Sequence, residues 1–514
     1  MANLGSLAKD TAIYGLSSII GRFLNYLLVP LYTAKLSVAS GGYGVITNIY
    51  SYTALILVIL TFGMETTFFR FTNKENENPN TVFSTTLIAV GSVALMFVLL
   101  VMGFLPWISS GMGYSDHPEY IAVMAVVVAL DAFQAIPFAY LRYKHKPIKF
   151  ASLKLLFIFL NITLNLIYFV LLPALYKNSP ETIGKIYDPT VGVGYAFFLN
   201  LVCTAFITLF FIPELKIHYT FDRRLLRRML SYTWPLLILG ITGILNQTAD
   251  KILFPFLYDS ATAKSQLGIY GAASKIAMIM AMITQAFRYA YEPFVFGKSR
   301  DKDNRDTYAQ AMKYFLIFTL LAFVAVVAWL DVLKYIIAPG YWSGLRVVPI
   351  VMAAEIMMGI YFNLSFWYKL TDRTIWGAWF SGIGCAVLIA VNVLFVPTYG
   401  YMACAWAGCA GYGTAMLLSY FVGQKYYPIR YPIRSMAVYV LLALVLTAAI
   451  LLVPVPNAWL RLAYRTFLLL LFAAFIVKRE QMGGMFARLP LVGRLFSKNK
   501  ASANKASAKQ TPEN

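Results

Sequence analysis

Uninterrupted apolar runs constrain this chain more than any other feature of its sequence. They are roughly 18 to 26 residues long and recur about fourteen times along the 514 residues. A helix of that length rises far enough to cross a hydrocarbon core of about 30 Å. Only 13% of the residues are charged, against about 25% in an average soluble protein. A soluble multidomain protein is therefore excluded, and an all-α polytopic membrane protein is predicted.

The apolar runs predict fourteen transmembrane helices with short connections. Their expected positions are 11–33, 43–69, 82–108, 118–142, 148–172, 190–212, 232–257, 267–294, 307–331, 343–368, 374–396, 400–422, 433–454 and 459–477. An even number of spans places both termini on one side of the membrane. The residues from 478 to 514 read as an amphipathic and basic tail.

The distribution of basic residues predicts which side that is. The net charge is +21, and Lys and Arg gather in the segments on the side of the termini, above all in 142–146 and 223–228. Because cytoplasmic loops of membrane proteins are enriched in Lys and Arg, both termini are expected in the cytoplasm. The same rule explains the charge excess without a nucleic-acid partner.

A weak internal repeat divides the chain into two halves. Tyr43-Gly44 and Tyr270-Gly271 open the second and eighth spans at an offset of 227, and Glu65 and Glu292 follow at the same offset. Asn165 and Asn392 are also 227 apart, and Pro30-Leu31-Tyr32 resembles Pro255-Phe256-Leu257-Tyr258. We therefore expect an N-lobe at 1–212, a basic cytoplasmic linker at 213–231, a C-lobe at 232–422, two extra spans at 423–477 and the tail at 478–514. Each lobe would hold six helices, related by pseudo-symmetry about an axis along the membrane normal.

Cationic and amide side chains inside the spans form the first group of candidate site residues. Charges at bilayer depth cost about 2.5–3.5 kcal/mol each on insertion scales, so they tend to face a wet cavity or a partner. Since both lobes contribute cations, we expect a basic cavity between them that receives a negative group. The substrate-binding candidates are Arg22, Asn25, Asn246, Gln247, Lys251, Lys275 and Arg288.

Carboxylates inside the spans form the second group. Asp131, Asp250 and Glu355 lie at membrane depth, where a carboxylate either has a structural partner or titrates. They are the candidates for coupling transport to H⁺ or Na⁺. No His or Cys cluster has the spacing of a metal site, so no metal or cofactor is expected.

The opening of the chain resembles a known family. Thr11-Ala12-Ile13-Tyr14-Gly15 and the following stretch from Gly21-Arg22-Phe23 to Pro30-Leu31-Tyr32-Thr33 are similar to the start of bacterial polysaccharide-repeat flippases (Wzx-like). These belong to the superfamily of multidrug, oligosaccharidyl-lipid and polysaccharide exporters. The resemblance implies two lobes around a cationic lumen in the bacterial inner membrane. It implies, as substrate, an undecaprenyl-diphosphate-linked oligosaccharide moved from the inner to the outer leaflet, with membrane lipids and the polymerase machinery as partners.

The same resemblance assigns the first-span arginine to Arg22 and, more loosely, the lumenal cations to Lys275 and Arg288. Two alternatives stay open within the superfamily: an ion-coupled multidrug antiporter and a lipid II flippase. An enzyme of the same pathway is disfavoured, because its only motif, Asp301-Lys302-Asp303, lies in a short charged loop. The sequence names neither the glycan, nor the coupling ion, nor the oligomeric state.

Overall fold

The computed structural model describes residues 24, 26–73, 77–298, 305–371 and 373–480, with the backbone alone from 289 to 298. Within these ranges the secondary structure is helical and contains no strand. The predicted all-α fold class is confirmed. The chain forms two compact units, the first made of residues 1–308 and 333–430 and the second of 309–332 and 431–514.

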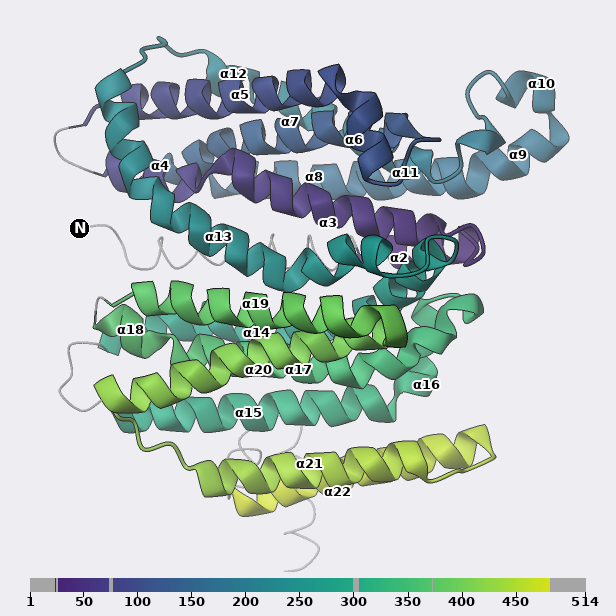
Figure 1. Cartoon of the computed structure of the whole chain (residues 1–514), viewed down its shortest axis with the longest axis vertical. Helices are drawn as coiled ribbons and strands as arrows, with labels where there is room; N and C mark the ends of the chain where they lie inside the picture. Colours follow the sequence, from purple (N-terminus) through teal and green to yellow (C-terminus); the bar gives the residue numbers. More distant parts are fainter. Residues whose placement is uncertain (1–23, 25, 74–76, 299–304, 372, 481–514) are drawn as a thin grey trace, which may run out of the picture. The chain divides into compact units, whose positions relative to one another are not determined.

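The first half of the first unit consists of long apolar helices joined by short helical turns (Figure 1). Its helices are α2 (Leu28–Lys35), α3 (Gly42–Thr61), α4 (Met64–Thr72), α5 (Pro79–Gly103), α6 (Leu105–Gly111), α7 (Pro118–Tyr143), α8 (Pro147–Leu166), α9 (Leu172–Asn178), α10 (Pro180–Ile183), α11 (Gly194–Leu209) and α12 (Ile212–Leu215). A π-helical stretch at Ile167–Leu171 joins α8 to α9. Helix α5 packs on α7, and α11 packs on both α7 and α8.

The remaining helices of the first unit form a second group, which contacts α3 through α13 and α14. They are α13 (Arg223–Leu257), α14 (Ala263–Lys298), the start of α15 (Arg305–Ala328), α17 (Val348–Leu364), α18 (Phe366–Leu370), α19 (Ile375–Tyr399) and α20 (Tyr401–Tyr426). Helix α20 packs on α17 and α19, while α13 and α14 both pack on α3. In Figure 1, α14, α17, α19 and α20 lie together, and α13 runs beside α3.

Local sequence signals explain where several of these helices begin. Pro79, Pro118 and Pro147 stand at the first helical positions of α5, α7 and α8, where a missing N–H costs nothing. The Asp222 side chain accepts hydrogen bonds from the backbone N–H groups of Arg224 and Leu225 at the start of α13. That cap extends the helix nine residues upstream of the predicted start at 232, through the basic run assigned to a linker.

The second unit is a small group of helices connected by ion pairs. It contains most of α15, the start of α16 (Leu330–Leu333), α21 (Ile433–Leu452) and α22 (Ala458–Arg479). Asp331 accepts from Arg461 at 2.6 Å and from Arg465 at 3.0 Å. Glu480 accepts from Lys313 and from the Tyr439 hydroxyl, both at 2.6 Å. Helices α21 and α22 are therefore tied to residues 309–332.

Eleven helices of the described residues are long and apolar enough to cross a membrane. They correspond to predicted spans 2–5, 7–11, 13 and 14. Helix α11, at 16 residues, is shorter than the criterion, and α20 is 26 residues long but is not among the eleven. Most of the first predicted span lies outside the described residues. The expected count of fourteen and the division into lobes therefore remain predictions.

Candidate functional site

A cavity of about 540 Å³ opens among the helices of the first unit. Residues of α3, α13, α14, α17, α19 and α20 line it. Seven of the sequence candidates lie on its wall together: Asn246, Gln247, Asp250, Lys251, Lys275, Arg288 and Glu355. They come from three helices, α13, α14 and α17, so the fold brings them together.

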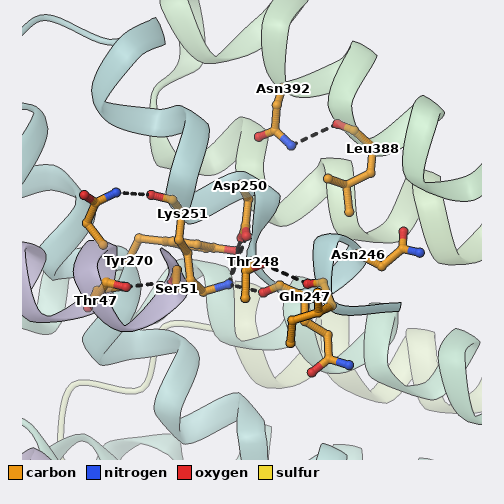
Figure 2. Close-up of polar contacts among 12 residues, drawn as sticks. Thr47, Ser51, Asn246, Gln247, Thr248, Asp250, Lys251, Tyr270, Leu388 and Asn392 are labelled. Atoms are coloured by element: carbon orange, nitrogen blue, oxygen red, sulfur yellow. Dashed lines mark hydrogen bonds and ion pairs between the residues drawn. The ribbon is translucent and has the colours of Figure 1, made fainter. Parts of the chain in front are cut away.

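The Asp250 carboxylate and the Lys251 ammonium form a partly buried ion pair on α13 (Figure 2). The Lys251 Nζ lies 3.0 Å from each carboxylate oxygen and 2.9 Å from the Gln247 carbonyl oxygen. The Tyr270 hydroxyl of α14 donates to Asp250 Oδ2 at 2.6 Å. These contacts pair the Lys251 charge within α13, and the Tyr270–Asp250 hydrogen bond links α13 to α14.

A side chain of α3 completes this network. The Asn48 amide donates to the Lys251 backbone carbonyl at 2.8 Å, and Tyr114 donates its hydroxyl to the Asn48 side-chain oxygen at 2.9 Å. Asn48 is 2% exposed. The two sequence halves therefore meet at the ion pair through hydrogen bonds as well as through packing.

Two cations on the cavity wall are placed differently from Lys251. Both Lys275 and Arg288 lie on α14 and line the cavity. Lys275 is near Lys251, and among the described residues no carboxylate forms an ion pair with its ammonium. Arg288 is exposed, and its guanidinium lies 4.8 Å from the centre of the Phe362 ring of α17, a cation–π arrangement.

Two acceptors on the cavity wall lack a hydrogen-bond donor within the part of the chain that the structure describes. Glu355 Oε2 and Asn246 Oδ1 are both buried without a hydrogen-bond partner among the described residues. Asn246 is 9% exposed, and its amide nitrogen donates to the Thr242 and Ser381 carbonyl oxygens. Since buried polar atoms are usually satisfied, a cluster of open acceptors on a cavity wall fits a ligand with donors.

Close backbone packing shuts one end of the cavity. At that end α3 crosses α14, where a Cβ added at Gly44 would collide with the Lys264 carbonyl and one added at Gly268 would lie 3.0 Å from the Gly44 nitrogen. Tyr43 and Tyr270 are 2% and 3% exposed there. Arg288, by contrast, is exposed at the other end of the lining stretch of α14. The cavity therefore runs from a closed end at Tyr43 and Tyr270 to an open end at Arg288.

Comparison with known proteins identifies the family. A family profile described as "Polysaccharide biosynthesis protein" matches residues 7–288, which is more than half of the chain. The chain belongs to this polysaccharide biosynthesis family. No curated protein matches the sequence.

Solved structures similar to this family member have the transporter fold. A lipid II flippase, MurJ, in an inward closed conformation aligns with a TM-score of 0.70 at 15% identity over 91% of this chain and 99% of its own. A multidrug resistance MATE family transporter of the MOP superfamily, facing inward, aligns with a TM-score of 0.59 at 13% identity over 81% and 94%. At these identities the likeness concerns the fold.

Three sequence candidates do not join the cavity group. Asp131 lies on α7, does not line the cavity, and interacts electrostatically with Lys154 of α8. Lys154 Nζ lies 4.0 Å from the centre of the Phe138 ring. Arg22 and Asn25 lie outside the described residues.

Sequence reasoning missed the uncharged residues that shape the site. Asn48, Tyr270 and Phe362 hold or contact the charged candidates, and Tyr412 donates to the Asn246 carbonyl at 3.1 Å. The repeated Tyr-Gly pairs were the available signal for Tyr270, because both pairs lie where α3 crosses α14. Nothing in the local sequence marks Phe362 or Tyr412.

Proposed function

We propose that this member of the polysaccharide biosynthesis family is a flippase for undecaprenyl-diphosphate-linked oligosaccharide repeat units. It would move them from the inner to the outer leaflet of the bacterial cytoplasmic membrane by alternating access. The family match and the likeness to the folds of a lipid II flippase and a multidrug transporter support a lipid-linked flippase or transporter. The cargo is the one that the family resemblance implies, and the cations of the site support its negative charge.

The observation that carries the proposal is the pair of cations on the cavity wall, Lys275 and Arg288. Lys275 has no carboxylate partner among the described residues, and Arg288 is exposed at the open end. Phosphate oxygens are acceptors that ammonium and guanidinium groups bind with charge-assisted hydrogen bonds. A diphosphate cargo supplies negatively charged oxygens that the Lys275 ammonium and the exposed Arg288 guanidinium can bind.

A polar cavity inside an apolar helical unit also suits the energetics of flipping. A hydrated saccharide and its diphosphate would lose their water in the hydrocarbon core, and unpaired polar groups there cost several kcal/mol each. The cavity offers Asn246, Gln247, Lys275 and Glu355 in place of that water. The polyprenyl tail can stay in the bilayer while the headgroup crosses.

The remaining roles follow the sequence analysis and are part of the same proposal. Arg22 and Asn25 would add substrate contacts from the first span, and Asp131, Asp250 or Glu355 would couple transport to H⁺ or Na⁺. The protein would act as a transporter rather than an enzyme, with both termini in the cytoplasm and a polysaccharide polymerase system receiving its product. In that orientation the open end of the cavity at Arg288 faces the cytoplasm.

An ion-coupled multidrug antiporter is the second candidate. Two carboxylates, Asp250 and Glu355, lie on the cavity wall, and a cationic drug needs such groups. However, Asp250 is already paired with Lys251 and Tyr270. Of these two carboxylates, Glu355 is the one with an oxygen that has no hydrogen-bond partner among the described residues.

Deleting the gene and complementing it with variants tests the proposal. The deletion is expected to accumulate one lipid-linked saccharide on the inner leaflet, and the wild-type gene to remove it. A variant with both Lys275→Gln and Arg288→Gln should fail to complement at a normal protein level. Lys177→Gln, an exposed lysine of α9 that does not line the cavity, is the matched control and should complement fully. Drug accumulation with normal glycan would favour the antiporter instead.

A further inference from the structure

Three buried polar atoms on the cavity wall have no hydrogen-bond partner among the described residues. They are Asn246 Oδ1 on α13, Thr284 Oγ1 on α14 and Glu355 Oε2 on α17. The Asn246 side chain belongs to a residue that is 9% exposed, and Thr284 is 3% exposed. Since buried polar atoms normally have a partner, their position on one cavity indicates a partner that enters from outside the chain.

Asn246 and Glu355 lie near the same tyrosine of α20. The Asn246 amide nitrogen donates to the backbone carbonyl oxygens of Thr242 and Ser381, so the amide oxygen is the atom that remains for a ligand. Tyr412 donates its hydroxyl to the Asn246 backbone carbonyl at 3.1 Å and interacts electrostatically with Glu355. The two open acceptors therefore belong to one region of the cavity wall.

Thr284 differs from two other threonines that line the same cavity. Thr47 and Thr248 donate their hydroxyls to the carbonyl oxygens four residues earlier, both at 2.8 Å. The Thr284 hydroxyl makes no such bond within the described part of the chain. A buried hydroxyl without a partner lowers stability, so a hydrogen bond to a ligand would explain a threonine at this position.

The parts of the proposed cargo differ in whether they can satisfy these atoms. A ligand that displaces water from Asn246 Oδ1 and Glu355 Oε2 must donate hydrogen bonds, because an acceptor left without a donor weakens binding. The polyprenyl tail is a hydrocarbon, and an ionised diphosphate offers only acceptors. Saccharide hydroxyls both donate and accept, as a Ser or Thr hydroxyl does. The saccharide is therefore the part of the cargo that fits these atoms.

We propose that Asn246, Thr284 and Glu355 form the subsite for the saccharide part of the cargo. Its hydroxyl groups donate to Asn246 Oδ1 and Glu355 Oε2 and exchange a hydrogen bond with the Thr284 hydroxyl. This rests on the proposed function and names the part of the cargo that these residues bind. It gives Glu355 a binding role and adds the uncharged Thr284 to the site.

Binding of two lipids tests the subsite. The first is undecaprenyl diphosphate without sugar, and the second is the lipid-linked saccharide that accumulates in the deletion strain. The affinity of the full chain in nanodiscs for each is measured by native mass spectrometry. Thr284→Val and Glu355→Gln should each weaken binding of the saccharide lipid by about threefold to tenfold, the scale of one hydrogen bond. Both variants should leave the affinity for undecaprenyl diphosphate within about twofold of wild type.

The melting temperature of the protein without added lipid is the second readout. Thr284→Val should keep or raise it, because the substitution removes a buried hydroxyl that has no partner in the described chain. The matched control is Thr86→Val on α5, outside the cavity wall, where the buried hydroxyl donates to the Val82 carbonyl at 2.7 Å. This control should change neither lipid affinity and should not raise the melting temperature.

The outcomes separate the subsite from the function. If Thr284→Val and Glu355→Gln weaken both lipids equally, or weaken neither, the saccharide subsite is wrong while the flippase proposal stands. A lower melting temperature for Thr284→Val would also contradict the subsite, because it would indicate a structural role for the hydroxyl. If the wild-type protein binds neither lipid, the flippase proposal itself fails.

Discussion

At the scale of single residues, the Asp250–Lys251 ion pair shows that a charged residue on the cavity wall can stabilise the fold instead of binding a ligand. Adjacent residues on a helix point about 100° apart, so their pairing depends on side-chain conformation and on Tyr270 of another helix. The ammonium is 22% and the carboxylate 9% exposed. Removing one partner of a buried pair leaves the other charge uncompensated, which costs more than the pair contributes.

We therefore expect Asp250→Asn to lower the stability of the protein by about 3 kcal/mol. Combining it with Lys251→Met removes both charges and should restore most of that loss. The thermal melting of the purified protein in detergent measures both changes. An unchanged melting temperature for Asp250→Asn alone would show that the ion pair does not contribute to the stability of the protein.

Two asparagines at the repeat offset provide a matched pair of sites. Asn165 and Asn392 are both fully buried, and each donates its amide to the carbonyl four residues earlier, in Asn161 and Leu388 (Figure 2 shows the second). In the first half, the Tyr32 hydroxyl donates to Asn165 Oδ1 at 2.8 Å. In the second half, Asn392 Oδ1 has no partner among the described residues.

This difference predicts unequal effects of the same substitution. Tyr32→Phe should destabilise the protein by about 1–3 kcal/mol, because it leaves a buried acceptor unsatisfied. Tyr258→Phe, at the corresponding position of the second half, removes no described bond to Asn392 and should cost clearly less. The melting temperatures of the two variants measure this difference. A larger decrease for Tyr258→Phe than for Tyr32→Phe would contradict the prediction.

Seven of the ten candidate residues line the cavity. Five of these seven are charged, and they could be singled out from sequence because charge at membrane depth is costly wherever it occurs. The same reasoning could not separate Asp131, which shares that cost but interacts electrostatically with Lys154 on a neighbouring helix. Nor could this reasoning predict that Lys251 forms an ion pair with Asp250. Both outcomes depend on which side chains face each other across helices, and a single sequence carries little information about that.

At the scale of helices, the crossing of α3 and α14 is the contact that closes the cavity. Gly44 and Gly268 allow the two backbones to meet, and the Tyr341 hydroxyl donates to the Leu36 carbonyl at 2.7 Å beside them. A transporter that alternates between open ends must separate these helices in its other state. The glycines therefore favour the state in which this end is shut.

Gly44→Ala is expected to force α3 and α14 apart, because its Cβ would overlap the Lys264 carbonyl. The substitution should lower the melting temperature and reduce complementation. Gly243→Ala on α13, where no atom lies within 4 Å of an added Cβ, is the matched control and should melt at or above the wild-type temperature, since Ala favours a helix. Equal melting temperatures for the two variants would contradict the claim that close packing of α3 on α14 at Gly44 stabilises the protein.

The helices themselves were predictable because their apolar length is a strong signal, but their ends were less so. The basic run 223–228 indicated a loop, yet Asp222 caps it into α13. The loop expected at 173–189 contains α9 and α10, two short helices that begin near Pro173 and at Pro180. The hydropathy of the sequence locates transmembrane helices. It carries little information about short helices in the segments that connect them.

At the scale of the whole molecule, the grouping of residues 309–332 with α21 and α22 was not predictable from sequence. The repeat assigned the ninth span to the second lobe, whereas the compact unit joins most of it to the two extra spans. Lys313 with Glu480 and Asp331 with Arg461 are 130 residues or more apart in the chain. Pairing over such distances is a property of the tertiary structure.

The orientation of the chain in the membrane is testable by labelling. In a variant without the four native cysteines, Lys177→Cys should react with an impermeant thiol reagent in intact cells. Lys144→Cys, on the predicted cytoplasmic side, should react only after permeabilisation. Both lysines are exposed, so accessibility to the reagent depends on the side alone. The reverse pattern would invert the predicted topology.

Flipping by the purified protein tests the central claim most directly. The protein is reconstituted into vesicles that carry the lipid-linked saccharide of the deletion strain in one leaflet, and its appearance in the other leaflet is followed with a sugar-modifying enzyme that cannot cross the membrane. The account predicts rapid transfer with the wild-type protein and transfer at the protein-free rate when Lys275→Gln and Arg288→Gln are combined. Transfer by that double variant at the wild-type rate would contradict it.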